Sequence, residues 1–465
     1  MTATSTARTY DRLVPGLTLG ARVVVAGTHS GVGKTTVATG LMAALRRAGL
    51  RVASAKVGPD FIDPGFHQLA TGRPPRNLDA WICGPDAVAP LAARAGDGAD
   101  VLVVEGVMGL FDGAGPGTSA STAAVATALR APLVLVVDAS AMSGSVAALV
   151  HGFHTFEPGV ALAGVVLNRV GGDGHAGLLR DALAPLGVPV LGALPRDDAL
   201  TWRDRHLGLV PVVEDRQAAL RAVDRLAGAV AARVDLGAVL GLARAAPPVP
   251  VGTLAPTRHV GHAAVAVAAG PAFSFTYPDN LERLQQAGAE IVPFDPASDA
   301  RLPAGATAMV VGGGFPEVFA EALAANRPLL DDVRRRVAGG LVTWAECGGL
   351  LWLCRSLDGR RLVGAVPADA TMAGRPTLGY RTATVRSACP LAAAGTTLRG
   401  HEHHWSAVTP PGDALDLGGD GGGSLAGFAG PTMLASYLHL HLGADPAPAE
   451  RFVATAAAAA ARPSS

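Results

Sequence analysis

The sequence lacks an excess of charge of either sign. Its 465 residues include 38 Lys+Arg and 38 Asp+Glu, so the formal net charge is zero. Proteins that bind nucleic acid or an anionic membrane through their overall charge carry a basic surplus, so neither partner is expected. A small anionic substrate would have to be held by local groups instead.

Cysteines are few. The four of them form no CxxC pair and no zinc-binding spacing: Cys83, Cys347, Cys354 and Cys389. A disulfide framework is not expected in a chain of this length, and reduced thiols in the cytoplasm are the simpler interpretation.

Long hydrophobic runs are also missing, although the mean hydropathy is +0.33. The apolar run at 123–137 is interrupted by Arg130 and Pro132. The alanine-rich end is too short to span a bilayer and predicts a terminal helix. The first residues contain no apolar core of signal-peptide length. We therefore expect no membrane segment and no signal peptide.

What the sequence does contain is short β-branched runs that alternate with Ala- and Leu-rich stretches. Such runs predict a doubly wound α/β domain over 21–242, built on a parallel sheet. The Pro-rich segment 243–260 is predicted to be a linker, residues 1–20 a flexible tail, and 261–465 a second α/β domain. The expected strands are 22–27, 51–57, 101–106, 132–138, 162–168 and 188–194, then 263–270, 290–294, 307–314 and 340–347.

A phosphate site is predicted where strand 22–27 runs into GTHSGVGKTT (27–36) and then into a helical stretch. Glycines let backbone N–H groups approach phosphate oxygens, Lys34 would neutralise the β- and γ-phosphates, and Thr35 would ligate Mg²⁺. The spacing from Gly27 to Gly33 is one residue longer than the usual P-loop and resembles the loop of dethiobiotin synthetase. The alternative is an ordinary Gly-rich turn. The candidate ATP-binding residues are Gly31, Gly33, Lys34, Thr35, Thr36 and Asn168.

Acidic residues follow two of the expected strands, at the edge where a parallel sheet meets its ligand. Glu105 ends one strand, and Asp112 follows it. The stretch KVGPDFIDPGFH (56–67) adds Lys56, Asp60 and Asp63. Hard oxygen ligands suit Mg²⁺, so Thr35, Asp60 and Glu105 are the predicted metal ligands. Solvated loop carboxylates are the alternative. Asn168 could read the adenine edge, or it could be a simple strand-end turn residue.

The second half carries the marks of a thiol enzyme. Three glycines follow strand 307–311 and could offer an oxyanion hole. Cys347 lies between a strand and a helix, where a sharp turn presents a nucleophile and a helix N-terminus lowers a thiol pKa. Two His-rich stretches, 401–406 and 435–443, could supply the base. The alternative is that Cys347 is a buried core cysteine.

Taken together, these motifs resemble the cobyrinic or hydrogenobyrinic acid a,c-diamide synthase family, over about residues 21–450. The matching stretches are GTHSGVGKTT, KVGPDFIDPGFH, NLDAW, VEGVMGLFDG, RHLGLV, GGGFPE, ECGGLLWL, LGYR, GHEHHWS and ASYLHLH. The resemblance implies an N-terminal synthetase domain similar to dethiobiotin synthetase and a C-terminal class I glutaminase domain.

The resemblance also implies residue roles. Cys347 would be the nucleophile, His439 its base, and Gly313 and Gly314 the oxyanion hole. By the resemblance Asp60, Asp63, Glu105 and Asp112 would lie around ATP, metal and substrate. Lys56 is a further candidate beside the substrate. Arg205 and His206 are candidate partners for the substrate carboxylates on their chemistry alone, and a solvated surface turn is the alternative. The sequence departs from the family at Phe61 and Phe111, where many members have Tyr. It also reads A-E-C at the elbow, where most class I enzymes read G-x-C.

The predicted function is ATP- and glutamine-dependent amidation of corrin carboxylates in cobalamin biosynthesis. The expected partners are small molecules (the corrin polycarboxylate, glutamine and ATP with Mg²⁺), and a homodimer is left open. The Ala-, Gly- and Arg-rich composition favours the metal-free hydrogenobyrinic acid over cobalt-bearing cobyrinic acid. Three alternatives stay open: a cobyric acid synthase, a regulatory P-loop ATPase that binds partner proteins, and a P-loop protein with a metal cluster.

Overall fold

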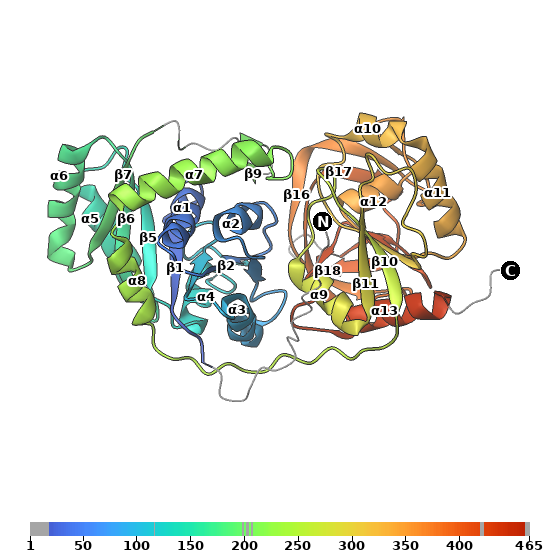
Figure 1. The fold of residues 1–465 in the computed structure, drawn as a ribbon, viewed down its shortest axis with the longest axis horizontal. Helices are drawn as coiled ribbons and strands as arrows, with labels where there is room; N and C mark the ends of the chain where they lie inside the picture. The colour runs from blue at the N-terminus through green and yellow to red at the C-terminus, as the bar shows by residue number, and fades with distance from the viewer. Residues whose placement is uncertain are drawn as a thin grey trace.

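The computed structural model describes residues 18–115, 117–197, 200, 204–205, 208–418 and 423–460. It shows two lobes side by side, joined by an extended segment that runs beneath both (Figure 1). The first lobe is blue to green and the second yellow to red in that view.

The first lobe contains a seven-stranded parallel sheet in the order β3-β2-β4-β1-β5-β6-β7. Its strands are almost fully buried because helices cover both faces, as the apolar runs predicted. The strands are β1 (Arg22–Gly27), β2 (Val52–Val57), β3 (Arg76–Leu78), β4 (Val101–Glu105), β5 (Leu133–Asp138), β6 (Leu162–Val170) and β7 (Val190–Pro195).

The side chains of β1 point alternately into two hydrophobic cores, one on each face of the sheet. Val23 and Val25 pack with the helices of one face, and Val24 and Ala26 with those of the other. The first face carries α1 (Lys34–Arg47), α2 (Asp63–Thr71), α7 (Arg216–Arg233) and α8 (Leu236–Arg244). The second carries α3 (Val88–Gly96), α4 (Thr122–Ala128), α5 (Ser145–Thr155) and α6 (Asp173–Leu183). The 3-10 turns Pro85–Ala87 and Ala184–Leu186 and the short pair β8 (Asp204–Arg205) and β9 (Gly208–Leu209) complete the lobe.

A strap of extended chain, residues 245–262, links the lobes between α8 and the next strand. Its first part lies on the first lobe, where the Leu19 N–H donates to Val249 O at 3.2 Å and Thr18 bridges Pro250. Its last part lies on the second lobe, where Arg258 pairs with Glu450. The predicted linker is therefore held along its length.

The second lobe contains a six-stranded sheet, parallel except for its last strand, in the order β11-β10-β12-β13-β21-β20. Helices α9 and α13 cover one face, and α10 to α12 the other. The strands are β10 (Ala263–Ala268), β11 (Ala289–Phe294), β12 (Ala308–Val311), β13 (Val342–Glu346), β20 (Phe428–Gly430) and β21 (Met433–Ser436). The helices are α9 (Pro278–Ala287), α10 (Ala320–Ala325), α11 (Arg327–Ala338), α12 (Gly348–Leu353) and α13 (Ala447–Ala460).

A second sheet in this lobe was not predicted. Its centre is the long antiparallel pair β16 (Asp369–Val385) and β17 (Thr397–Thr409), and β16 lies on the side of the first lobe (Figure 1). The other strands are β14 (Ser356–Leu357), β15 (Arg360–Arg361), β18 (Leu415–Gly418), β19 (Ser424–Ala426) and β22 (His439–Leu440). The predicted terminal helix is α13. Among the described residues, no helix is both long and apolar enough to cross a membrane.

Candidate active site

The predicted phosphate loop joins β1 to α1 at the centre of the first sheet. Gly31 and Gly33 have positive φ angles of 84° and 94°, which favour glycine. A Cβ on Gly33 would lie 2.2 Å from the Asn168 amide nitrogen. Lys34 Nζ reaches back over the loop and donates to His29 O at 3.1 Å. The loop thus presents backbone N–H groups and an ammonium at a helix N-terminus, the chemistry that binds phosphate.

A buried charge cluster lies beside the loop, where β2 and β4 run in register and place Lys56 opposite Glu105. Lys56 Nζ donates to Glu105 Oε1 at 2.9 Å and to Asp63 Oδ2 at 2.7 Å. The Thr35 hydroxyl donates to Glu105 Oε1 at 2.6 Å. His67 Nε2 lies 2.5 Å from the other oxygen, Oε2. Every polar atom of the Glu105 carboxylate is therefore engaged.

Mutual attraction sets the charges of this cluster. Burial opposes the charge on Lys56, but Asp63 and Glu105 hold the pKa of Lys56 above its usual range. Burial also opposes the charge on Glu105, yet Lys56 and His67 lower the Glu105 pKa. Burial and then the nearby Asp60 carboxylate raise the pKa of Asp63. The cluster therefore contains one firmly ionised carboxylate and one that takes up a proton more readily.

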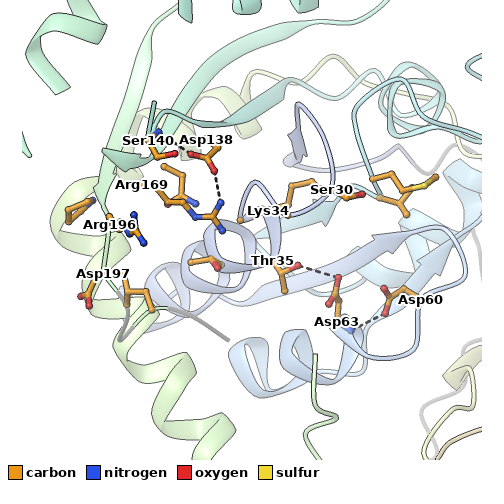
Figure 2. Close-up of a pocket in the computed structure, with 18 of the residues that line it drawn as sticks. Ser30, Lys34, Thr35, Asp60, Asp63, Asp138, Ser140, Arg169, Arg196 and Asp197 are labelled. Carbon is orange, nitrogen blue, oxygen red and sulfur yellow. Dashed lines mark hydrogen bonds and ion pairs between the residues drawn. The ribbon is translucent and has the colours of Figure 1, made fainter. Parts of the chain in front are cut away.

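A cavity of about 790 Å³ opens over the loop and the cluster. Figure 2 shows Lys34 and Thr35 between two groups of polar residues, with Asp60 and Asp63 on one side. The other side is formed by the ends of β5, β6 and β7: Asp138, Ser140, Arg169, Arg196 and Asp197. Sequence reasoning missed this second group and His67. Strand-end position is the one signal that could have found the group, and the spacing from Asp63 to His67 along α2 could have found the histidine.

The remaining predicted residues of this lobe fall into three classes. Asp60 lines the cavity, and its Oδ1 accepts the N–H groups of Ile62 and Asp63 at the start of α2. Asn168 also lines the cavity and donates to Val32 O at 2.8 Å, so it supports the phosphate loop. Asp112 is exposed and accepts the Gly109 N–H at 2.7 Å. His206 and the Arg205 side chain lie outside the described residues.

The second lobe places Cys347 in a strained turn between β13 and α12. Its φ and ψ are 49° and −102°, unusual values for a residue other than glycine. A Cβ on Gly349 would lie 2.2 Å from Val311 O, so glycine is needed for this close approach. This is the sharp strand-to-helix turn that exposes a nucleophile.

His439 lies beside this turn, deep in the protein. Its Nδ1 is 3.5 Å from Glu346 Oε2, and its ring stacks on His401 with 4.9 Å between centroids. Burial alone would lower the His439 pKa, but the neighbouring Cys347 and then Glu346 raise it to about 10. An imidazolium beside a thiol favours the thiolate, which is the nucleophilic form. The second His-rich stretch therefore supplies the imidazole beside Cys347, and the first supplies a backbone oxygen, His403 O, at 3.9 Å from Cys347 Sγ.

The predicted oxyanion hole needs a correction. The Gly313 N–H already donates to Phe275 O at 3.1 Å, and the Phe275 N–H returns a bond to Gly313 O. The donor role predicted for Gly313 is therefore not supported. Gly314 N lies 3.0 Å from the position of a Cβ on Gly348, so Gly314 lies beside the turn that follows Cys347.

Phe61 connects the two sites. It lies in the loop between β2 and α2 that also carries Asp60 and Asp63, yet its ring lies 5.0 Å from the ring of His439. It also packs 4.3 Å from Tyr277 and 5.3 Å from Phe275. Phe61 is therefore an apolar contact on His439. Phe111, the other departure, packs against Phe153 and Phe156.

His441, two residues after His439, has different neighbours. Its Nδ1 lies 3.2 Å from Cys83 Sγ, and its Nε2 lies 3.8 Å from Asp279 Oδ2. Cys83 therefore has a histidine neighbour. Burial raises the Cys83 pKa well above its usual value, which fits a structural thiol.

Comparison with known proteins agrees with this division of the chain. Residues 23–210 match the CobQ/CobB/MinD/ParA nucleotide binding domain, and residues 264–447 match the CobB/CobQ-like glutamine amidotransferase domain. The chain is 48% identical to a hydrogenobyrinate a,c-diamide synthase of Streptomyces coelicolor, over 93% of this chain and 96% of the relative. It is 46% identical to that of Thermobifida fusca over the same shares. A cobyrinate a,c-diamide synthase of Synechocystis is 41% identical over 92% of each chain. The chain belongs to the hydrogenobyrinate and cobyrinate a,c-diamide synthase family.

Proposed function

We propose that this protein uses ATP and glutamine to convert the a and c carboxylates of hydrogenobyrinic or cobyrinic acid into carboxamides, a step of cobalamin biosynthesis. The observation that carries the proposal is the joining of two sites in one chain. Phe61 connects a phosphate loop with a buried carboxylate cluster to a strained Cys347 beside His439.

In the glutaminase half, the Cys347 thiolate attacks the amide carbon of glutamine. His439, held as an imidazolium, gives its proton to the departing ammonia. The N–H groups of Gly314 and of Gly348, at the start of α12, are the proposed donors to the oxyanion. Water then hydrolyses the thioester and releases glutamate, which returns Cys347 to its starting state.

In the synthetase half, a carboxylate is a poor electrophile because its leaving group would be oxide. Transfer of the γ-phosphoryl group gives an acyl phosphate, from which ammonia displaces phosphate. Lys34 offsets the charge of the phosphoryl oxygens, and Asn168 holds the loop. Of the predicted Mg²⁺ ligands we keep Thr35 and Glu105 and replace Asp60 with Asp63, because Asp60 Oδ1 accepts backbone N–H groups at the start of α2. The Thr35 hydroxyl lies 2.6 Å from Glu105 and 3.3 Å from Asp63, and these hard oxygens would hold Mg²⁺, which would neutralise phosphate charge.

We further propose that residues 21–242 form the synthetase domain and 261–465 the glutaminase domain, with 243–260 between them. One mainly parallel sheet on each side and the end of α8 at Arg244 support this division. The metal-free substrate remains our preference. Comparing kcat/KM on the cobalt-bearing and metal-free acids tests it, and a strong preference for the cobalt form would overturn it.

The function is tested by incubating the protein with hydrogenobyrinic acid, ATP, Mg²⁺ and glutamine, and following product mass. We expect two successive replacements of hydroxyl by amino, each dependent on ATP, and then no further change. A product with more than two amides would indicate a cobyric acid synthase instead. ATP hydrolysis without amidation would contradict the proposal.

A further inference from the structure

Glu346 lies immediately before the nucleophile, at the end of β13, and its carboxylate is almost fully buried. Oε1 accepts the Trp344 indole N–H at 3.1 Å and the Leu440 backbone N–H at 3.0 Å. Oε2 faces His439 Nδ1 at 3.5 Å. One carboxylate therefore touches both the backbone and the ring of the segment that carries the catalytic histidine.

The other described side chains around His439 have different partners, which leaves Glu346 as the carboxylate beside Nδ1 of His439. His401 stacks on the His439 ring, and Phe61 packs against it at a tilt of 49°; neither side chain carries a negative charge. Glu402, the other buried carboxylate nearby, is paired with Arg381 Nε at 2.9 Å. His441 turns toward Cys83 and Asp279. Burial and the positive charge of His439 lower the pKa of His401, so His401 is neutral and supplies no counter-charge.

The Nδ1 atom of His439 needs a partner. It is buried and lacks a hydrogen bond of ordinary length among the described residues. A separation of 3.5 Å exceeds the usual 2.7–3.2 Å, but catalytic hydrogen bonds are often long before substrate binds. A small rotation of the ring toward Oε2 would close the gap, and a hydrogen on Nδ1 leaves Nε2 for the sulfur of Cys347.

We propose that Glu346 is the positioning residue of the glutaminase site: its carboxylate holds His439 in the tautomer and orientation that keep Nε2 directed at Cys347. It also stabilises the imidazolium formed with the thiolate. The A-E-C sequence at the elbow thus supplies, from the strand before the nucleophile, the carboxylate that completes a Cys–His–Glu arrangement. This inference rests on the proposed use of glutamine.

Glu346→Gln tests the idea because it preserves shape. The amide oxygen can still accept from Trp344 and Leu440, whereas the amide nitrogen would face Nδ1 as a donor and favour the wrong tautomer. We expect kcat for glutamine hydrolysis to fall by roughly a hundredfold or more with a smaller change in KM. Ammonia-dependent amidation should be retained. Alkylation of Cys347 by iodoacetamide should require a higher pH than in the wild type.

Two further variants sharpen the result. Glu346→Asp, which keeps the charge, should recover part of the lost kcat and shift the alkylation profile back toward the wild type. Glu402→Gln, the matched change at the neighbouring buried carboxylate, should leave the alkylation profile of Cys347 where it is.

An unchanged kcat and alkylation profile in Glu346→Gln would overturn the proposal. Parallel loss of ammonia-dependent and glutamine-dependent amidation in both Glu346 variants would also overturn it, because that pattern marks a general structural role. If the wild type amidated no corrin acid with either nitrogen source, the proposed function would fail. The alkylation profile would still test Glu346.

Discussion

At the scale of single residues, the surroundings of Lys34 destabilise its positive charge. Burial, and then the positive charge of Lys56, lower the Lys34 pKa to about 8. The free enzyme therefore loses this ammonium as pH rises through about 8, and anionic ATP is bound less tightly above it. We expect the Kd for ATP to be constant at lower pH and to rise up to about tenfold per pH unit above 8.

Titration calorimetry across this pH range measures the effect. Lys34→Arg provides the control, since its guanidinium stays ionised and should flatten the profile. An equally steep rise of Kd in Lys34→Arg would assign the titration to another group.

A second prediction concerns the thiol of Cys347. Cys347→Ser keeps the size of the side chain but loses the easily ionised thiol. We expect glutamine-dependent amidation to fall by at least about a thousandfold, while ammonia-dependent amidation persists. Cys354, a fully buried cysteine one helix away, provides the matched control: Cys354→Ser should retain glutamine use. Full glutamine use by Cys347→Ser would remove the nucleophile from the proposal.

These residues show what a sequence can and cannot locate. Lys34, Thr35 and Cys347 could be predicted because a strand, a turn and a helix beside them in the chain define their surroundings. His67 was missed: its spacing from Asp63 places it on the same face of α2, but its partner is a carboxylate 38 positions away. Gly313 was misassigned for a similar reason: the Phe275 backbone that takes up its N–H comes from a distant segment.

At the scale of elements, the loop between β2 and α2 serves both sites. Phe61→Ala would remove the ring that packs on His439, so the histidine would be free to turn away from Cys347. We expect kcat for glutamine hydrolysis to fall about tenfold, because misplacing a catalytic group by about 1 Å can cost up to a hundredfold. Phe61→Tyr keeps the ring and should stay close to the wild type.

The measurement is glutamate release, with and without ATP and corrin acid. In the wild type, binding at the first site can act on His439 through this loop, so release should rise when ATP and corrin acid are present. In Phe61→Ala that response should be lost. An intact response would show that the loop carries no signal between the sites.

Some strands could be predicted from the sequence and others could not. Every strand of the first sheet except β3 was predicted, because strands buried on both faces read as continuous apolar runs. The pair β16 and β17 was missed. The middle of β16 is mostly exposed and contains Gly, Pro and Arg, so no alternating pattern marks it as a strand. The strand forms because β17 pairs with it over most of its length, and this pairing cannot be seen in the composition of β16.

At the scale of the whole molecule, a buried ion cluster joins the lobes. Arg76 binds Asp279 and Glu282 at 2.7 Å each, and Arg94 binds Glu282 at 2.8 Å. Asp279 is completely buried. Removing one partner from a buried pair leaves an uncompensated charge, which costs about 3–5 kcal/mol. Because Arg76 keeps Glu282 as a partner in Asp279→Asn, we expect the free energy of unfolding to fall by about the lower end of this range.

Denaturant titration of the intact protein measures the change. Asp224→Asn gives the comparison, because it breaks an exposed pair with Arg47 and should cost no more than about 1 kcal/mol. If the two variants lost similar amounts of unfolding free energy, the buried ion pairs between the lobes would add no more stability than an exposed ion pair.

The strap at 245–262 has a consequence for how the two lobes are kept together. Its first part is bonded to the first lobe and its last part to the second, where the Arg258 N–H and guanidinium both bind Glu450. The backbone between these attachments mainly sets the effective concentration of one lobe near the other, which is in the millimolar range for short tethers. Since the interface has its own buried ion pairs, residues 1–252 and 253–465 produced as two chains should assemble into an active heterodimer. If the two chains co-purify in equal amounts and amidation declines on dilution, the covalent link serves mainly to keep the two lobes at a high local concentration.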